Sequence, residues 1–288
     1  MWPVPAAKRG TAGRAEGMAG FEMIKEDGLT YFLVSGWYEE GALAVFSTRR
    51  GGLSGGSYAT LNLSFRVGDE AATVRENRRR LARALGIPVE RWVAGAQVHG
   101  SRVAEVGEAE AGQGAMRAED AIAAADGLVT RLPRLALVGL FADCVPLLFF
   151  RRFPPAVAVI HAGWRGTVAG IAQAAVDALC CEPGAGPADL KVAIGPSIGP
   201  CCYIVGEEVV AGLRALLGPE VETVVFPEGQ RWRVDLAQAN VLALRRRGVA
   251  AEQISLFSRC TACHPEWFYS HRRDGGRSGR FAALVSLF

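Results

Sequence analysis

Short apolar runs alternate along this chain with glycine-rich turns and amphipathic segments, and this alternation is the feature that most restricts the fold. Apolar runs bounded by Gly or Pro favour buried strands, which we expect at 43–48, 135–141, 145–150, 156–160, 190–194 and 254–257. Apolar residues at helical spacing predict helices over 69–85, 167–180, 205–217 and 235–246. Some strands are joined by connections too short for a crossover. We therefore predict an α/β fold, a single-domain layered sandwich with mixed β-sheets.

The charge balance argues against two classes of partner. Lys and Arg number 32 and Asp and Glu 29, so the formal net charge is only +3. Binding to nucleic acid or to a membrane surface needs a basic cluster, so we expect neither partner. No low-complexity linker divides the 288 residues. We expect a flexible basic tail over residues 1–20, a single catalytic domain over 21–288, and a monomer or weak dimer.

Cysteine and glycine usage indicate the compartment and the places to look for a site. The seven cysteines are odd in number and include two adjacent pairs, which does not match a secreted disulfide framework. No signal peptide is visible, so we predict reduced thiols and a cytoplasmic protein. The 35 glycines gather between apolar runs, which indicates tight turns and close backbone approaches in an ordered domain.

Three potential metal ligands each lie where an apolar run ends or is interrupted. His99 follows the apolar segment that begins near Trp92, Cys144 interrupts an apolar run, and His161 ends another run at a glycine turn. Separate strands could deliver all three to one place. Two His and one Cys leave the fourth position of zinc open for water or substrate, which is the catalytic rather than the structural pattern.

The same side chains permit a second chemistry. A cysteine activated by a nearby histidine is a nucleophile for acyl transfer, and Asp143 could orient the imidazole or act as an acid or base. Cys144 with His99 or His161 would then form the catalytic group of a cysteine hydrolase. Because both interpretations use the same atoms, metal content is the property that separates them.

A Cys-x-x-Cys-His string at 260–264 matches the pattern of covalent haem attachment. Without an export signal that function is improbable, and a metal or redox pair would need partners elsewhere in the chain. We therefore interpret Cys260 and Cys263 as small buried thiols near a strand end.

Arginines lie beside several of the glycine turns. Arg49 and Arg50 precede Gly51, Arg165 precedes Gly166, and four arginines surround the glycines at 275–279. Guanidinium groups next to free N–H groups at a turn are suited to an anionic oxygen ligand such as phosphate.

Taken together, these strings resemble the bacterial multicopper polyphenol oxidase (laccase-like) family, whose members are now regarded as zinc-dependent purine nucleoside phosphorylases with adenosine deaminase activity. The matching segments run from about residue 43 to the C-terminus and are Ser47–Gly52 with Leu61–Leu63, Gln97–Gly100, Ala125–Gly127, Ala142–Pro146, His161–Gly166, Gly195–Cys202 and Ser270–Gly275. Seven matches in order are highly specific, whereas any one alone would be weak.

The resemblance implies one catalytic zinc ion held by His99, Cys144 and His161. It implies a fold similar to the cysteine-hydrolase-like fold of toxin deamidases, and purine nucleosides (adenosine, inosine, guanosine, methylthioadenosine) with phosphate as substrates. The resemblance also implies that contacts with substrate or phosphate are made by Arg49, Asn62, Arg165 and Arg272. A peptidoglycan precursor is the alternative substrate if the protein is a cysteine hydrolase.

The small number of histidines in the chain makes copper a less suitable metal than zinc. A laccase holds several coppers largely through imidazoles, and this chain has four histidines in all. The sequence departs from the family pattern at Ile204, where an acid is frequent, and at His271, where an aromatic residue is common. Both departures bear on substrate preference and leave the three predicted ligands intact.

Overall fold

The computed structural model describes residues 13–288. Its strands, in chain order, are β1 (Gly13–Met18), β2 (Phe21–Glu26), β3 (Leu29–Val34), β4 (Ala42–Ser47), β5 (Trp92–Ala94), β6 (Val103–Glu105), β7 (Gly127–Thr130), β8 (Ala136–Phe141), β9 (Val145–Arg151), β10 (Ala156–Ala162), β11 (Leu190–Ile194), β12 (Ile204–Val205), β13 (Val225–Glu228), β14 (Arg231–Val234), β15 (Ile254–Leu256) and β16 (Phe281–Leu287). Its α-helices are α1 (Trp37–Glu40), α2 (Ala71–Leu85), α3 (Trp164–Val168), α4 (Ile171–Leu179), α5 (Glu207–Leu217) and α6 (Leu236–Arg246).

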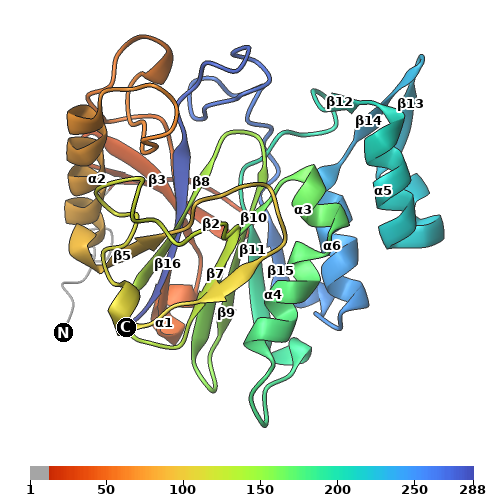
Figure 1. Cartoon of the computed structure of the whole chain (residues 1–288), viewed down its shortest axis with the longest axis horizontal. Coiled ribbons are helices and arrows are strands. Elements are labelled where there is room, and N and C mark those ends of the chain that lie inside the picture. The colour runs from red at the N-terminus through yellow and green to blue at the C-terminus, as the bar shows by residue number, and fades with distance from the viewer. Residues whose placement is uncertain (1–12) are drawn as a thin grey trace.

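The strands form two large mixed sheets and one small sheet. The first sheet has the order β1-β2-β3-β4-β16-β8-β5, and only its β5–β8 pair is parallel. The second has the order β15-β11-β9-β10-β7-β6, with parallel pairs at both edges. The third consists of β12, β14 and β13 (Figure 1). The predicted α/β fold with mixed sheets is confirmed.

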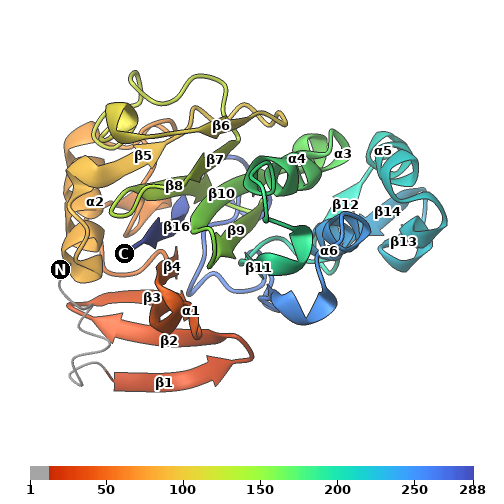
Figure 2. The same ribbon diagram turned by 90° about the horizontal axis from the view of Figure 1, so that it is seen from below.

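Three apolar clusters join the layers of this fold. The first fills the space between α2 and the outer face of the first sheet, where Leu81 of α2 meets Val45 and Leu284. The second lies between the two large sheets and contains Phe46 and Phe150. The third packs helices α4, α5 and α6 on the other face of the second sheet. Helix α2 and the α3–α6 group therefore lie on opposite sides of the paired sheets (Figures 1 and 2).

Most of the strands and helices expected from periodicity are present at nearly the expected bounds. The helix predicted over 69–85 is α2, which ends at Gly86 in the left-handed conformation. The apolar runs at 135–141, 145–150 and 156–160 are β8, β9 and β10. These three strands are buried along almost their whole length, as continuous apolar runs predict.

The helix predicted over 167–180 is instead two helices. Gly170 adopts φ 81°, a left-handed conformation that interrupts the helix and separates α3 from α4. Thr167, the first residue of the predicted helix, lies inside α3: Gly163 precedes α3 and Gly170 precedes α4. The interruption lets α3 begin directly after β10, close to the end of that strand.

Part of the basic tail expected over residues 1–20 lies within the described residues. Residues 13–18 form β1, which pairs antiparallel with β2 at the edge of the first sheet. Residues 1–12 lie outside the described residues. No helix within residues 13–288 is both long enough and apolar enough to span a bilayer.

Gly195, directly after β11 of the second sheet, packs closely against Phe46 of β4 in the first sheet. A Cβ atom there would lie 2.2 Å from Cε1 of the fully buried Phe46. We expect Gly195→Ala to lower the free energy of unfolding by about 1–3 kcal/mol, because the ring has no free space into which to move. Urea denaturation followed by circular dichroism measures this change.

Gly55→Ala is the matched control. Gly55 is exposed, has φ −108° and would meet nothing within 4 Å of the added Cβ. We expect this variant to unfold within about 0.5 kcal/mol of the parent chain. Equal stability of the two variants would contradict the close sheet contact at Gly195.

Candidate functional site

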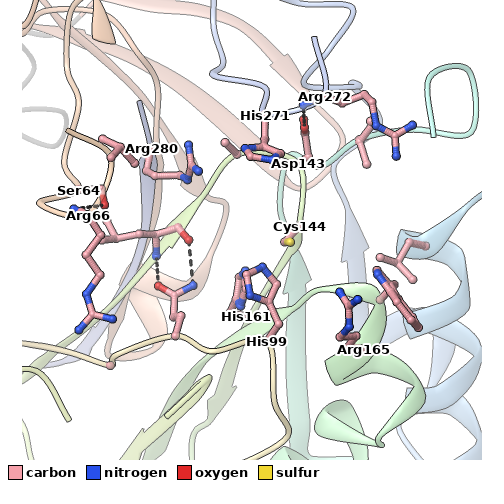
Figure 3. Close-up of a pocket in the computed structure, with 18 of the residues that line it drawn as sticks. Ser64, Arg66, His99, Asp143, Cys144, His161, Arg165, His271, Arg272 and Arg280 are labelled. Carbon is pink, nitrogen blue, oxygen red and sulfur yellow. Dashed lines mark hydrogen bonds between the residues drawn. The ribbon is translucent and has the colours of Figure 1, made fainter. Parts of the chain in front are cut away.

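Three strand ends bring His99, Cys144 and His161 together. β9 and β10 are antiparallel neighbours in which His161 is paired with Pro146, so Cys144, just before β9, and His161, near the end of β10, lie at one edge of the sheet. His99 comes from the segment after β5. One ligand atom from each of the three residues lies within 4.8 Å of the others (Figure 3). The convergence expected from the sequence is present.

Asp126, directly before β7, positions both histidines. Its carboxylate accepts the backbone N–H groups of Val98 (3.1 Å), His99 (2.9 Å) and Gly100 (2.8 Å). The same carboxylate lies 2.8 Å from Nδ1 of His161. These donors and the charge of His161 outweigh the effect of burial and hold the pKa of Asp126 below its usual range. One buried carboxylate therefore fixes the loop that carries His99 and the ring of His161.

The contact with Asp126 also determines the tautomer of His161. An ionised carboxylate can only accept a hydrogen bond, so Nδ1 carries the proton and Nε2 is left with a lone pair. This carboxylate–histidine arrangement is the one that orients metal-bound histidines in proteins. Nε2 is therefore the atom of His161 available to a metal ion.

Cys144 and His161 also polarise each other. Burial alone raises the pKa of the Cys144 thiol, but the positive charge of His161 and hydrogen bonds with both histidines lower it below its usual range. Burial lowers the pKa of His161, whereas Cys144 and Asp126 raise it above its usual range. Without a metal the pair favours a thiolate beside an imidazolium, and the thiolate is the form that binds a metal.

The backbone around the three residues leaves room for a bound group. Gly163 faces the group, and a Cβ on it would lie 3.1 Å from both Sγ of Cys144 and Cδ2 of His99. His99 itself adopts φ 63°, an uncommon conformation for a side-chain-bearing residue that its N–H bond to Asp126 holds in place. The glycine turn after His161 thus provides the close backbone approach expected from the sequence.

The three residues lie in the wall of a cavity of about 860 Å³. Its lining is rich in arginine and contains aromatic faces from Phe65, Trp164 and Tyr203. The arginines among its lining residues are Arg66, Arg78, Arg165, Arg231, Arg272 and Arg280. A cavity of this size accommodates a nucleoside-sized molecule, and its excess of positive charge favours an anionic partner.

Two of the arginines predicted to bind an anion line this cavity. Arg165 lies in the first turn of α3 and stacks on Trp164, with its guanidinium carbon 4.4 Å from the ring centre. Arg272 donates to the carbonyl of Ile204 (2.9 Å) and lies over Tyr203. Ile204 and His271, the two departures from the family pattern, also line the cavity.

Arg49 and Asn62 lie outside the cavity lining. Arg49 donates to the carbonyls of Ala59 and Pro265 and stacks on Tyr269. Asn62 is fully buried, and its amide oxygen accepts the N–H of Arg280 (2.9 Å). Substrate contacts by these two residues stay a prediction, and the contacts in the structure connect neighbouring loops.

Asp143 is buried between the cavity and the loop that carries Arg272. Its carboxylate accepts the hydroxyl of Thr261 (2.6 Å) and the backbone N–H of Arg272 (2.7 Å). Its φ of 90° is left-handed, as in the tight turn between β8 and β9. Asp143 thus positions Arg272, whereas its predicted role as an acid or base stays a prediction.

Asp126 and Arg280 are two site residues that sequence reasoning did not select. Asp126 had a signal, because it is an acid directly before the apolar run 127–130 and burial of an acid requires partners. Arg280 belongs to an arginine-rich segment in which nothing distinguishes it from Arg273 or Arg277. Its backbone bonds to Asn62 and Leu63, far away in the sequence, and it lines the cavity.

Comparison with known proteins gives one family for almost the whole chain. Residues 43–288 match the family model described as multi-copper polyphenol oxidoreductase laccase. The purine nucleoside phosphorylase YlmD of Geobacillus stearothermophilus is 42% identical over 247 residues, which are 85% of this chain and 90% of that protein. The adenosine deaminase RL5 of an unknown prokaryotic organism is 38% identical over 237 residues, covering 82% of this chain and 90% of that protein.

A solved structure shares the fold. The hypothetical protein YfiH of Bacillus licheniformis superposes with a TM-score of 0.88 at 34% sequence identity. The superposition covers 92% of this chain and 98% of that one.

Asp126→Asn tests the role assigned to the central carboxylate. An amide would point an N–H group at two of the four donors that Asp126 accepts. We expect this variant to bind Zn²⁺ at the His99–Cys144–His161 group about 10- to 100-fold more weakly, with the fold retained. Competition against a chromophoric chelator measures the affinity.

Asp120→Asn is the control, because Asp120 also accepts a backbone N–H, that of Gly114, but is neither a lining residue of the cavity nor a partner of the three proposed ligands. We expect its zinc affinity to match that of the parent chain. An Asp126→Asn variant with parental affinity would show that the carboxylate does not support the ligands.

Proposed function

Because this chain belongs to the multi-copper polyphenol oxidoreductase laccase family, in which relatives are named purine nucleoside phosphorylase and adenosine deaminase, we propose that it is a zinc-dependent purine nucleoside phosphorylase with adenosine deaminase activity. The observation that carries the proposal is that potential metal ligands and arginines lie in the wall of one cavity. His99, Cys144 and His161 line the same cavity as Arg165 and Arg272.

Phosphate binding falls to the arginines of the cavity. Arg165 and Arg272 each stack on an aromatic ring, which restricts the guanidinium plane before a ligand arrives. A pre-oriented guanidinium donates two parallel hydrogen bonds to an oxyanion. Arg272 is held further by the bonds of its backbone N–H to Asp143 and of its side chain to Ile204.

In phosphorolysis a phosphate oxygen attacks C1′ of the ribose as the bond from C1′ to the purine nitrogen breaks. The electron pair of that bond leaves with the base, which takes up a proton, and the sugar product is ribose 1-phosphate. The chain's own residues hold the two reactants together: arginines neutralise the phosphate, and the faces of Phe65 and Tyr203 offer apolar surface to the nucleoside. In deamination, water adds its oxygen to C6 of adenosine and ammonia leaves.

Zinc suits the three ligands better than copper. Two imidazoles and one thiolate would hold a zinc ion and leave one coordination position for substrate or water, and all three residues line the cavity. A zinc ion held there supplies Lewis-acid chemistry to a substrate oxygen or to water. Asp126 keeps Nε2 of His161 free, and Gly163 keeps the approach to Cys144 open.

A cysteine hydrolase is the second candidate, favoured by one specific observation. Cys144, His161 and Asp126 lie in the order nucleophile, base and orienting acid, and the pKa of the thiol is lowered by the adjacent histidine. In that chemistry Cys144 would attack an acyl carbon with no metal required. A peptidoglycan precursor would then be a candidate substrate.

The deciding experiment supplies purified protein with adenosine, inosine, guanosine or methylthioadenosine, each with phosphate. We expect ribose 1-phosphate (5-methylthioribose 1-phosphate from methylthioadenosine) and the free base, detected by chromatography, and inosine from adenosine without phosphate. Chelation should abolish both activities and added Zn²⁺ should restore them. No turnover of any nucleoside would refute the phosphorylase. Full activity of the zinc-free protein, lost on alkylation of Cys144, would favour the cysteine hydrolase.

Arg165→Ala tests the phosphate site. Losing one charge-assisted contact of about 1.5–3 kcal/mol should lower kcat/KM for phosphate about 10- to 100-fold. Phosphate-independent deamination should change much less, so the ratio of the two activities is the diagnostic measurement.

Arg83→Ala is the matched control, because Arg83 is an exposed residue of α2 that pairs with Glu76. We expect it to leave both activities unchanged. An equal fall of phosphorolysis and deamination in Arg165→Ala would contradict a phosphate-specific role.

A further inference from the structure

A second group of potential metal ligands lies outside the catalytic cavity. Cys201, Cys202, Cys260 and Cys263 place their Sγ atoms within 4.8 Å of one another, and none of the four lines the cavity. The expectation that Cys260 and Cys263 are buried thiols is wrong, because Cys263 is exposed and Cys260 is half-buried. The Cys-x-x-Cys string has the partners that its sequence alone did not reveal.

Two loops form this group. In the segment after β11, a turn in which the N–H groups of Cys202 and Tyr203 both bond to the carbonyl of Gly199 brings the adjacent cysteines to one side. The segment after β15 supplies the other two cysteines. An isolated parallel β-bridge pairs the backbone of Ser197 with that of Cys260. In it the N–H of Thr261 donates to the carbonyl of Ser197 (2.9 Å), which holds the two loops together.

The spacing of the sulfur atoms fits a single tetrahedral ion. Sγ of Cys263 lies 3.5 Å from Sγ of Cys201 and 3.4 Å from Sγ of Cys202. Four sulfurs at about 2.3 Å from a zinc ion are roughly 3.8 Å apart. Small changes in the Sγ–Sγ distances would reach that geometry without separating the two loops.

Arg273 connects the cysteines to the segment that carries Arg272. Its guanidinium donates to the carbonyls of Thr261 and Ala262, which lie between Cys260 and Cys263. The same guanidinium pairs with Asp274 (2.7 Å). The loop that supplies two of the four sulfurs is therefore joined to the arginine segment of the cavity wall.

We propose that Cys201, Cys202, Cys260 and Cys263 bind one structural Zn²⁺ ion, distinct from the catalytic group. The group has four sulfur ligands and, among residues 13–288, no fifth His, Cys, Asp or Glu donor, which is the closed, structural pattern of zinc. Its role follows from what the two loops carry. Tyr203 and Ile204 line the cavity from one loop, and Arg272 lines it from the other. The ion ties together the two segments between which the Arg272 side chain is held.

The test uses the whole chain with the catalytic ligands removed. His99→Ala with Cys144→Ala leaves all four cysteines of the second site in place. Expressed with zinc available and purified under reducing conditions, this variant should retain one zinc ion per chain by elemental mass spectrometry. X-ray absorption at the zinc edge should show sulfur ligands only, at about 2.3 Å. Adding Cys201→Ser and Cys263→Ser should remove the metal.

The matched control adds Cys180→Ser and Cys181→Ser instead, because this pair is also adjacent in sequence but belongs to neither metal group. It should keep its zinc. The proposal is overturned if the first variant holds no zinc, holds copper or iron instead, shows nitrogen or oxygen ligands, or carries a disulfide by intact mass. If the serine variant fails to fold, the absorption spectrum of the first variant decides alone. None of these results depends on nucleoside turnover, so the proposed activity can fail while this site stands.

Discussion

The buried carboxylate of Asp126 is the interaction on which the site depends. It accepts three consecutive backbone N–H groups and faces the ring of His161. The backbone carbonyl of Asp126 also accepts the N–H of His161 (2.7 Å). Removing the carboxylate would leave buried N–H donors without an acceptor, and removing a donor would leave a buried charge with fewer partners. Either loss lowers stability more than the loss of an ordinary surface contact. The left-handed backbone of His99 persists because this carboxylate holds it.

Asp143 has a corresponding role on the opposite side of the cavity. Its carboxylate holds Thr261 and the backbone of Arg272, and its carbonyl accepts the N–H of Ile198 (2.9 Å). The turn between β8 and β9 thus carries two adjacent residues with different tasks, since Cys144 faces the histidines and Asp143 faces the arginine loop. Both tasks rest on the two large sheets, whose buried strands keep the ends of β9 and β10 side by side.

The pattern of apolar residues along the sequence was sufficient to predict the elements that neighbouring residues determine. Apolar runs and helical spacing predicted α2 and the central strands, because burial of continuous apolar surface decides them. His99, Cys144 and His161 could be selected because each is a metal-ligand type at a strand end. Long-range contacts decided the rest. Gly170 divides a helix that periodicity alone continues, and Asn62 is buried through partners far along the chain. The same limitation concealed the link between Cys201 and Cys263, which are 62 residues apart.

The two potential metal sites differ in their number of ligands and in their access to the cavity. These differences suit the His99–Cys144–His161 group and the four-cysteine group to different roles. Three potential ligands beside a large cavity would leave a coordination position of a bound metal for a substrate, and the hydrogen bonds of Asp126 would hold His99 and His161 in place around it. Four sulfurs on two loops leave no such position, so an ion bound there can act only through the loops it joins. Those loops carry Tyr203 and Arg272, whose stacking forms one wall of the cavity. The histidine side of the cavity is therefore fixed by a carboxylate within the sheet edge, whereas the arginine side, built from irregular segments, requires a cross-link of its own.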